Sequence, residues 1–358
     1  MNLLFLVNPV SGSMYGRKLA GWIEQNNSIH GIRKQIVFTD VPRLRSQVHS
    51  LATDKDLVVI CGGDGTVSAV TSCLAEMDTP PAVAVIPVGT GNDIARATGW
   101  LRVWQEGRLD GFWSGLVAGT VSPVDIWSFE GAGSFIAYAG IGLDAAVVRR
   151  VASIRKKFSG TGNRLMINFF YMLAGFSVFC RSACLRQKCR GEVNCISMAV
   201  DMPRGNMAFS ELLLANIVSY AGGSMLSDKQ GKDRLAMMAD GLLETYIFRG
   251  TSEFFHLISG RCPALVTPVP PTGQSQSVDI VLEMPADLQL DGEWVMELSP
   301  NRPYNISRTR SIPFLIPPDN FKVNERVGMK DDIAALMERL SAPAPGSAVN
   351  RARIRGNH

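Results

Sequence analysis

The sequence predicts a protein of two domains, an α/β N-terminal domain with a parallel sheet and a β-rich antiparallel sandwich as the second domain. Over residues 1–124, apolar runs alternate with amphipathic stretches, which is typical of a parallel sheet covered by helices on both faces. Over residues 125–325, short β-rich segments are separated by turn residues, which favours an antiparallel sandwich. The length of 358 residues also exceeds one typical domain.

In the first domain, each predicted strand is a short apolar run and each predicted helix has apolar residues at helical spacing. The strands are Leu3–Val7, Gln35–Thr39, Asp56–Ile60 and Ala82–Ile86, and the helices are Gly16–Gln25, Leu44–Thr53, Val67–Glu76 and Ile94–Thr98. Ligands of parallel sheets bind outside the carboxyl ends of the strands. The residues that directly follow these strands are therefore the first candidates for a functional site.

A helical connector, Trp104–Ala118, leads into the second domain. Its predicted strands are Val124–Phe129, Ser134–Ala139, Asn194–Asp201, Glu211–Ser219, Leu242–Phe248, Val278–Glu283 and Val295–Leu298. The sequence leaves open whether the end of this domain returns to the first one. Residues 341–358 begin with Ser-Ala-Pro-Ala-Pro-Gly and end in a basic stretch, which predicts a disordered tail.

Composition indicates a globular protein, with 46% hydrophobic and 19% charged residues and a net charge of +4. The seven cysteines are scattered singly, which favours a reducing compartment. The apolar stretch Leu3–Val7 is too short for a signal peptide and lacks a basic leader, so we expect a cytoplasmic location. Basic residues are not interleaved with aromatic residues on a recognisable module, and nucleic-acid binding is not expected.

The most informative motif, Gly62-Gly63-Asp64-Gly65-Thr66, directly follows a buried strand. A glycine turn that opens a helix leaves backbone N–H groups accessible, and these can hold polyphosphate at the positive end of the helix. An aspartate beside phosphate repels it unless a cation lies between them, so Asp64 is predicted to engage a Mg²⁺-nucleotide. The alternative is an ordinary corner that uses glycine for positive φ.

Three further segments bring glycines together with small polar or acidic side chains. In Asn8–Ser13, Asn8 and Ser11 can hydrogen-bond a ribose or phosphate and Gly12 allows close approach, or the segment is an ordinary turn with a serine cap. In Pro87–Asp93, the hydroxyl of Thr90 is predicted to face phosphate, while Asn92 or Asp93 can instead cap a helix.

The third segment, Leu290-Asp291-Gly292-Glu293-Trp294, lies far along the chain. Its alternative reading is a hairpin turn of the Asp-Gly type.

Together these motifs resemble the diacylglycerol kinase catalytic family, which includes bacterial diacylglycerol kinase-like proteins, sphingosine kinases and ceramide kinases. Asn-Pro-x-Ser-Gly, Gly-Gly-Asp-Gly-Thr, Gly-Thr-Gly-Asn-Asp and a late Asp-Gly-Glu occur in the family's order over residues 1–320. Gly-Gly-Asp-Gly-Thr alone indicates only a superfamily shared with NAD kinases, whereas the first and last motifs favour the lipid kinases. The resemblance implies the NAD kinase/diacylglycerol kinase-like fold.

The resemblance also implies ATP and Mg²⁺ as cofactors and a nucleotide site after the first four strands. The residues carried over to this site are Asn8, Ser11, Gly12, Thr39, Gly62, Gly63, Asp64, Gly65, Thr66, Val67, Ser68, Thr90 and Asn92. Thr39 enters only through the resemblance, as the threonine after the second strand.

Glu293 occupies the family's proton-acceptor position, so the resemblance assigns catalysis to Glu293 together with Asp64. The expected function is an ATP-dependent lipid kinase that transfers the γ-phosphoryl group to a lipid hydroxyl, with diacylglycerol as the preferred acceptor and phosphatidic acid as the product. The alternatives are a kinase of sphingoid bases, ceramide or another lipid, a kinase of a soluble substrate such as NAD, and a non-catalytic nucleotide- or lipid-binding regulator.

In bacterial members of the family, a second, structural Mg²⁺ binds at positions that correspond to Met237, Asp240 and Leu242. One carboxylate, two backbone carbonyls and waters can form a Mg²⁺ shell, although an Asp-Gly turn explains the same residues without metal. The chain departs from the family pattern just upstream, where Gly222-Gly223-Ser224-Met225 replaces an all-glycine version.

Two neighbouring stretches favour peripheral contact with a membrane surface that carries the lipid substrate. Leu165–Cys180 is apolar but shorter than the ~20 residues of a spanning helix. The basic cluster Arg149, Arg150, Arg155, Lys156 and Lys157 can meet anionic headgroups, or form a solvated helix face. The oligomeric state is left open, with a homodimer as one alternative.

Overall fold

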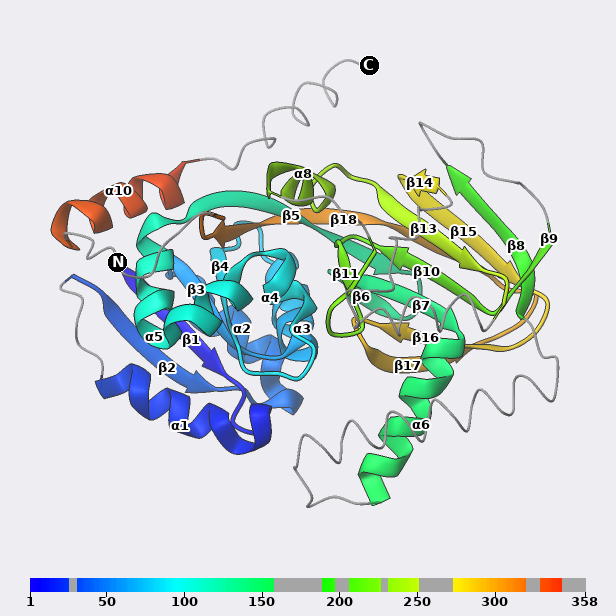
Figure 1. The fold of residues 1–358 in the computed structure, drawn as a ribbon, viewed down its shortest axis with the longest axis horizontal. Helices are drawn as coiled ribbons and strands as arrows, with labels where there is room; N and C mark the ends of the chain where they lie inside the picture. The colour runs from blue at the N-terminus through cyan, green and yellow to red at the C-terminus, as the bar shows by residue number, and fades with distance from the viewer. Residues whose placement is uncertain are drawn as a thin grey trace, which may run out of the picture. The chain divides into compact units, whose positions relative to one another are not determined.

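The computed structural model describes residues 1–25, 31–157, 189–196, 206–226, 231–250, 273–319 and 329–342 (Figure 1). The described residues form two compact units. Unit 1 comprises Met1–Asp125 and Arg310–His358, and unit 2 comprises Ile126–Thr309. Two long strands, β5 (Thr120–Phe129) and β18 (Pro303–Ile316), each run from one unit into the other.

Unit 1 contains a parallel sheet in the order β2-β1-β3-β4. The strands are β1 (Asn2–Val7), β2 (Arg33–Phe38), β3 (Leu57–Gly62) and β4 (Ala82–Pro87), and the end of β18 joins β4 in parallel through Phe314 and Val83. The strands β3 and β4 are buried along their whole length, because helices cover both faces of the sheet (Figure 1).

The helices of unit 1 follow the strands in the order expected for a wound α/β sheet. They are α1 (Ser11–Gln25), the 3₁₀ turn η1 (Val41–Arg43), α2 (Leu44–Ala52), α3 (Asp64–Ala75), α4 (Asp93–Ala97), α5 (Trp100–Ala118) and α10 (Met329–Ser341). Helix α5 is kinked at Arg108, whose φ of 51° is not helical.

Unit 2 is built from two sheets. One contains the unit 2 parts of β5 and β18 together with β6 (Gly133–Phe135), β15 (Ser277–Leu282), β8 (Cys189–Ile196) and β9 (Asn206–Phe209). The other is antiparallel, in the order β14 (Gly273–Ser275), β13 (Leu243–Phe248), β10 (Glu211–Ala215), β7 (Tyr138–Gly142), β16 (Ala286–Leu290) and β17 (Glu293–Leu298).

Three smaller pieces complete the described part of unit 2. A short hairpin pairs β11 (Ser219–Tyr220) with β12 (Ser224–Met225). Helix α6 (Leu143–Lys157) packs on β7, β16 and β17, and the short helix α8 is Gly231–Met237.

The core of unit 2 lies where alternating side chains of the two sheets meet. One sheet contributes Val278, Ile280, Leu282, Tyr304 and Ile306, and the other contributes Ala139, Ile141, Leu212, Leu214 and Leu288. Because strand residues alternate between faces, the opposite face of the antiparallel sheet carries the remaining residues of β7 and β10. That face carries Gly140 and Gly142 of β7 and Glu211 of β10, beside the buried Leu213 and Ala215.

The predicted fold class is confirmed, since an α/β N-terminal part with a parallel sheet precedes a separate antiparallel β part. Helix α1 begins at Ser11 rather than at the predicted Gly16, with an irregular first turn in which Gly12 and Met14 have φ of 60° and 73°. Helix α6 and strand β16 were not predicted. The predicted apolar stretch Leu165–Cys180 and residues 343–358 of the predicted tail lie outside the described residues.

Candidate functional site

In unit 1, the loops that follow β1, β3 and β4 are joined by backbone hydrogen bonds beyond the strands. The N–H of Asn8 donates to the carbonyl oxygen of Cys61 at 2.9 Å, and the N–H of Val88 donates to that of Gly62 at 3.0 Å. The residues predicted after these strands therefore lie along one edge of the sheet.

The glycines of these loops are required by close packing of backbone against backbone. A Cβ added to Gly89 would lie 2.3 Å from the Cα of Gly63, and a Cβ added to Gly63 would lie 2.9 Å from the Cα of Gly89. A Cβ added to Gly12 would lie 2.7 Å from the carbonyl oxygen of Val88. Gly63 has a φ of −95°, so the reading in which glycine supplies a positive φ does not apply to it.

Helix α3 starts directly at this contact. Its N-cap residue, Gly63, makes no side-chain cap hydrogen bond, and the carbonyl oxygen of Gly63 accepts the N–H groups of Thr66 and Val67 at 3.0 Å each. The positive end of the helix dipole, with the first-turn residues up to Ser68, thus lies at the edge where the loops meet. Phosphate groups bind where backbone N–H donors surround a surface that is free of side chains.

The Asp64 carboxylate ties α3 to the next helix. Its Oδ1 accepts the N–H of Ile94, in the first turn of α4, at 3.0 Å. Asn92, in the left-handed conformation with φ of 56°, makes no side-chain cap. Its amide instead closes on Gly89, whose N–H donates to Asn92 Oδ1 at 3.0 Å and whose carbonyl accepts Asn92 Nδ2 at 2.9 Å. Asn92 therefore occupies the N-cap position of α4, but its side chain does not cap the helix.

The other predicted nucleotide residues of unit 1 lie on the same edge. Asn8 Nδ2 donates to Thr66 Oγ1 at 2.8 Å, which links the loop after β1 to helix α3. The N–H of Thr39 donates to the carbonyl of Val7 at 2.9 Å, so Thr39 follows β2 beside the end of β1. Ser11 is half-buried at the start of α1 and Thr90 is exposed in the loop after β4.

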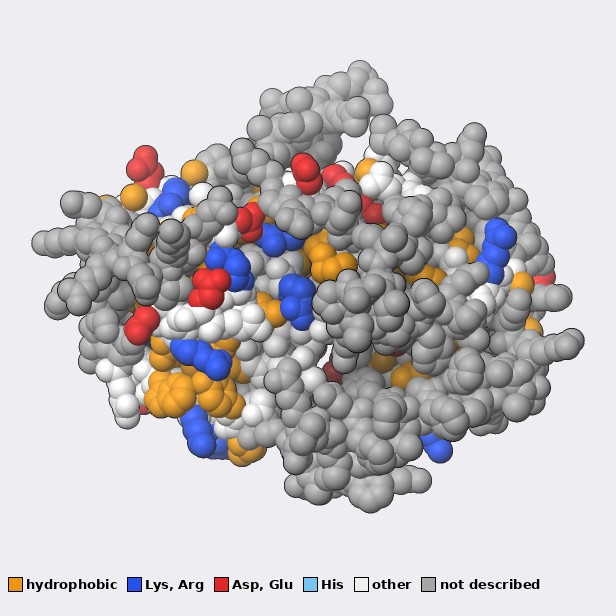
Figure 2. Space-filling view, viewed as in Figure 1, with side chains coloured by type: hydrophobic (Ala, Val, Ile, Leu, Met, Phe, Trp, Pro, Cys, Tyr) orange, Lys and Arg blue, Asp and Glu red, His pale blue; other side chains and the backbone are white. Residues whose placement is uncertain are grey.

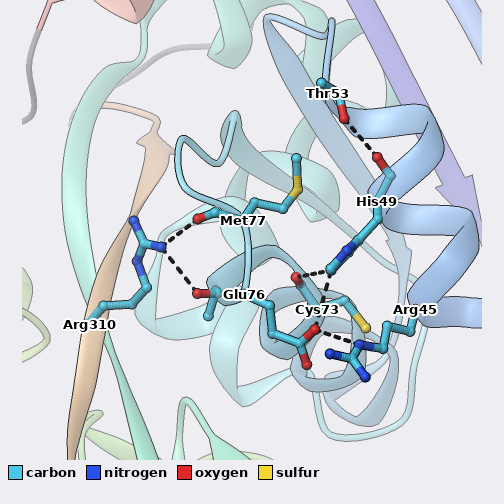
Figure 3. Close-up of polar contacts among 8 residues, drawn as sticks. Arg45, His49, Thr53, Cys73, Glu76, Met77 and Arg310 are labelled. Carbon is cyan, nitrogen blue, oxygen red and sulfur yellow. Dashed lines mark hydrogen bonds and ion pairs between the residues drawn. The ribbon is translucent and has the colours of Figure 1, made fainter.

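The opposite end of α3 is held by Arg310, from the unit 1 part of β18 (Figure 3). Arg310 Nη1 donates to the carbonyl oxygens of Ala75 at 3.2 Å and Met77 at 2.5 Å, and its Nη2 donates to that of Asp78 at 3.3 Å. A cation at the carboxyl end of a helix satisfies carbonyls that have no partner within the helix and complements its dipole.

A smaller cluster joins α2 to the same end of α3 (Figure 3). The Glu76 carboxylate lies 2.6 Å from Arg45 Nε and 3.3 Å from His49 Nε2. With Arg310, this cluster fixes the direction of α3 and hence the place of its first turn.

The residues of this edge fit a polyphosphate, because glycines clear the backbone and the helix presents N–H donors. Asp64 is the acidic residue that could contact a phosphate-bound Mg²⁺. Among the described residues there is no group of three or more His, Cys, Asp or Glu side chains that could hold a metal by themselves. A magnesium ion here would thus depend on phosphate oxygens and waters for most of its ligands.

In unit 2, Asp291-Gly292 forms the two-residue turn of the β16–β17 hairpin, in which Leu290 pairs with Glu293. The φ angles of 50° and 83° at Asp291 and Gly292 are those of a type I′ turn, so the hairpin reading of this motif is correct. The buried Asp291 carboxylate accepts the N–H groups of residues 136, 137 and 138 at 3.0, 2.7 and 3.0 Å.

This anchoring leaves Glu293 exposed at the first position of β17, directly after a turn whose backbone is fixed. A carboxylate on a rigid, solvent-accessible turn is suited to accept a proton from a bound hydroxyl. The hairpin geometry and the predicted catalytic role are therefore compatible, and the catalytic role stays a prediction.

Sequence reasoning missed a buried acidic cluster on the face of the antiparallel sheet that α6 covers. The hydroxyl of Tyr220 donates to Asp144 Oδ2, and the N–H of Asp144 donates to Glu211 Oε2 at 2.9 Å. Glu211 Oε1 is buried and accepts no hydrogen bond from a described residue. The motif Gly140-Ile-Gly142, in a strand directly before Asp144, is the signal that could have indicated this cluster.

The environment of this cluster disfavours two simultaneous negative charges. Burial raises the pKa of Asp144 to about 6, although the hydrogen bond from Tyr220 opposes this. Burial and then the charge of Asp144 raise the pKa of Glu211 well above its usual range. The two carboxyl groups therefore favour a state in which they share a single negative charge.

The residues predicted to hold a structural metal lie around a turn after α8. Asp240 Oδ1 accepts the N–H of Leu242 at 2.9 Å, and Gly241 has a φ of 74°, so an Asp-Gly turn is present. Met237 is buried at the end of α8. The guanidinium carbon of Arg308 lies 3.5 Å from where a Cβ of Gly241 would be. The guanidinium beside the turn disfavours a second cation here, and the metal role of Met237, Asp240 and Leu242 stays a prediction.

Family models match most of the chain. The model of the diacylglycerol kinase catalytic domain matches residues 2–129, and that of the diacylglycerol kinase accessory domain matches residues 134–294. The chain is 28% identical over 258 residues to a probable diacylglycerol kinase 3 of Caenorhabditis elegans, which covers 65% of this chain and 32% of that protein. It is 26% identical over 323 residues to human diacylglycerol kinase zeta, covering 81% of this chain and 33% of that protein.

The chain thus spans about a third of the length of these curated relatives. Among solved structures, a diacylglycerol kinase from Bacillus anthracis str. Sterne superimposes with a TM-score of 0.58 at 20% identity, covering 88% of this chain and 97% of that one. This likeness concerns the fold.

Proposed function

The chain belongs to the diacylglycerol kinase family, and from this premise we propose that it transfers the γ-phosphoryl group of ATP to a lipid hydroxyl, with diacylglycerol as the acceptor and phosphatidic acid as the product. The observation that carries the proposal is the close packing of three glycine loops at the first turn of α3. A catalyst of phosphoryl transfer acts mainly by positioning the phosphates and stabilising their charge, and this edge of unit 1 provides for both.

In the proposed reaction, the N–H groups at the start of α3 and the loops around Gly12, Gly63 and Gly89 hold the phosphates. Mg²⁺, when bound with the nucleotide, neutralises phosphate charge, and Asp64 is the residue that would contact it. Asn8 and Thr66 keep the loop after β1 in register with α3 through their 2.8 Å hydrogen bond.

Glu293 is the proposed proton acceptor for the lipid hydroxyl. It is exposed, and the turn before it is held by the buried Asp291 carboxylate, so the glutamate starts from a fixed backbone. A general base contributes about 10²–10⁴-fold to the rate of such a step. Glu293→Gln should therefore lower kcat by about that factor.

The test is incubation of the full chain with γ-labelled ATP, Mg²⁺ and a mixed lipid extract, with identification of the labelled product. Label in phosphatidic acid supports the proposal. Label in a sphingoid base, ceramide or another lipid would correct the acceptor, and label only in a water-soluble compound such as NADP would replace the lipid by a soluble substrate. No transfer, with nucleotide or lipid still bound, would indicate a non-catalytic regulator.

Contact with an anionic membrane surface is part of the proposal, because the acceptor is a lipid. The exposed large hydrophobic residues of the described chain gather in one stretch of unit 1, with Val10, Met14, Trp22, Phe38 and Val41 against only Met225 and Met284 elsewhere. In Figure 2, hydrophobic side chains lie over α1 with basic side chains on either side. Arg17 and Lys18 are exposed on the same helix.

In the basic cluster that the sequence suggested, Arg149 forms ion pairs within unit 2, whereas Arg150 is exposed. Arg149 Nη1 lies 3.0 Å from Asp287 Oδ1 and 3.1 Å from Glu297 Oε2, so its charge is already paired. Among the helices that the structure describes, none is both long and apolar enough to cross a bilayer. The proposed peripheral contact rests on α1, where exposed hydrophobic and basic side chains occur together.

A further inference from the structure

A chain of hydrogen bonds in unit 2 connects the buried acidic cluster to the turn that carries Glu293. Gln289 Nε2 donates to Asp144 Oδ2 at 3.3 Å, and Gln289 Oε1 accepts the N–H of Gly292 at 2.7 Å. Gln289 is fully buried on β16. One side chain thus joins the first turn of α6 to the residue directly before Glu293.

Glycines on the strand between make room for this side chain. In the pairing of β16 with β7, Gln289 stands opposite Gly140, and on the other side of β7, Glu211 stands opposite Gly142. A Cβ at Gly140 would lie 2.6 Å from Gln289 Nε2 and 2.8 Å from Glu211 Oε1. The two polar side chains therefore reach over a strand that has no side chain at this point.

The acceptor of this link is itself fixed from two further sides. The hydroxyl of Tyr220, on β11, donates to the same oxygen of Asp144 as Gln289 does, and Glu211 holds the backbone N–H of Asp144 at 2.9 Å. The ring of Tyr138, on β7, packs against that of Tyr220 with centroids 4.8 Å apart. Asp144 is thus a fixed acceptor rather than a mobile surface group.

We propose that Gln289 is a positioning residue for phosphoryl transfer, which transmits the fixed place of Asp144 and α6 to the Asp291–Gly292 turn and so sets the direction of Glu293. The inference rests on the proposed function, because it assumes that Glu293 is the proton acceptor. A misplaced base loses rate even when it remains present, and a shift of about 1 Å can cost on the order of 10²-fold. The glutamine acts through the turn and does not touch the substrate.

Three variants test this role. Gln289→Met keeps a similar volume and removes both hydrogen bonds, and Gln289→Glu keeps an acceptor for the Gly292 N–H but places a carboxyl against Asp144. Gln274→Met is the matched control, since Gln274 lies on β14 of the same sheet and donates to Glu244 Oε1 at 3.1 Å, away from the turn.

The expected result for Gln289→Met is a fall in kcat of about 10- to 100-fold, with the KM for ATP unchanged because the predicted nucleotide residues belong to unit 1. Amide hydrogen exchange at Gly292 should become at least severalfold faster, a readout that needs no activity. Gln274→Met should keep the wild-type kcat. An unchanged kcat or an unchanged Gly292 exchange rate in a folded Gln289→Met protein would overturn the inference.

The Gln289→Glu variant gives a pH signature that lost packing alone would not produce. The introduced carboxyl can donate to Asp144 only when protonated, and it faces Asp144, Glu211, Tyr220 and Tyr138. Its kcat relative to wild type should therefore fall as pH rises from about 6 to 8. A constant ratio over this range would contradict the proposed link.

The same assay separates this inference from the proposed function. Full activity of Glu293→Gln would refute the assignment of Glu293 as the base. The positioning role of Gln289 would then be refuted as well. Loss of activity in Glu293→Gln together with wild-type kcat in Gln289→Met would refute the positioning role alone.

Discussion

At the scale of single residues, the glycines of unit 1 matter for the space that they leave. Gly63 and Gly89 approach each other so closely that neither can carry a Cβ without moving the other backbone. Such contacts are between backbone atoms, which cannot yield as the end of a flexible side chain does. These two positions therefore set the relative place of two of the loops that we propose to bind phosphate.

We expect Gly63→Ala to destabilise unit 1 by about 1–3 kcal/mol, as overpacking typically does, and to weaken ATP binding. The measurement is urea unfolding together with titration of ATP by calorimetry. Gly21→Ala is the matched control, because nothing lies within 4 Å of a Cβ at this position of α1. Since alanine favours a helix over glycine, the control should be neutral or more stable by up to about 1 kcal/mol. Wild-type ATP affinity in Gly63→Ala would contradict the proposed cradle.

The half-buried Asp144, whose carboxyl is desolvated by its neighbours, predicts a pH dependence of stability. Its pKa rises from 3.8 to about 6 on folding, so the folded state holds the proton more tightly than the unfolded state does. The stabilisation is complete below the unfolded value and is lost as pH rises through the folded value. The contribution of Asp144 to the free energy of unfolding should thus fall as pH rises from about 4 to 6.

Urea unfolding at several pH values in this range checks the expectation. Asp144→Asn should flatten that part of the curve, whereas Asp110→Asn, at an exposed position of α5, should leave the curve unchanged. Equal pH dependence in the wild type and Asp144→Asn would show that the buried carboxyl does not titrate as inferred.

At the scale of secondary-structure elements, helix α3 is held at both ends. Asn8 and the glycine loops contact its first turn, and Arg310 binds carbonyls at its last turn. A helix that presents N–H groups to a ligand must keep its axis fixed, because a tilt at one end displaces the other. Arg310 is therefore relevant to the position of the first turn of α3, which we propose to bind phosphate.

Arg310→Met should lower the stability of unit 1 by about 2–3 kcal/mol, since it removes charge-assisted hydrogen bonds to partly buried carbonyls. Thermal unfolding measures the change. The matched control is Arg43→Met, where the side chain is 83% exposed and its ion pair to Asp40 is 3.9 Å long. An exposed pair of this kind contributes little, and the control should stay within about 0.5 kcal/mol of wild type. A comparable loss in both variants would mean that Arg310 has no special role.

The sequence predicted the elements whose signal is local. The strands of unit 1 are continuous apolar runs, and the Asp291–Gly292 turn follows from its dipeptide. Helix α6 was not predicted because its packing depends on a hairpin that is distant in sequence. The guanidinium carbon of Arg149 lies 5.2 Å from the centroid of the Trp294 ring in that hairpin. Glu211 was not predicted as a site residue because it stands first in an apolar strand, where a glutamate indicates only the end of the strand. The space for the Glu211 side chain comes from glycines of β7, and only the folded sheet places these glycines opposite Glu211.

At the scale of the whole molecule, the proposed function requires the protein to visit a lipid surface. We expect the full chain to bind vesicles that contain anionic lipid at low ionic strength and to dissociate as salt is added, because basic residues flank the exposed hydrophobic side chains on α1. Co-sedimentation measures the bound fraction. Absence of binding at low salt would remove the membrane proposal.

Single substitutions locate that surface. Trp22 is 47% exposed on α1, and Trp22→Ala should weaken vesicle binding by about tenfold through the loss of apolar contact. Met284→Ala, at 38% exposure in unit 2, is the control and should bind as wild type does. A larger loss of vesicle binding in Met284→Ala than in Trp22→Ala would place the membrane contact on the second unit rather than on α1.

The two-segment composition of unit 1 has a consequence for how the protein matures during translation. The indole of Trp100 donates to Leu315 O at 2.7 Å, and Arg339 Nη2 donates to Val117 O at 2.5 Å, so helix α5 finds partners in a segment that is translated after the second unit. A nascent polypeptide that ends before residue 310 lacks these contacts and the Arg310 cap. Helix α5 can therefore gain these contacts only after the second unit has been translated, and a product that stops before residue 310 would lack the second segment of unit 1.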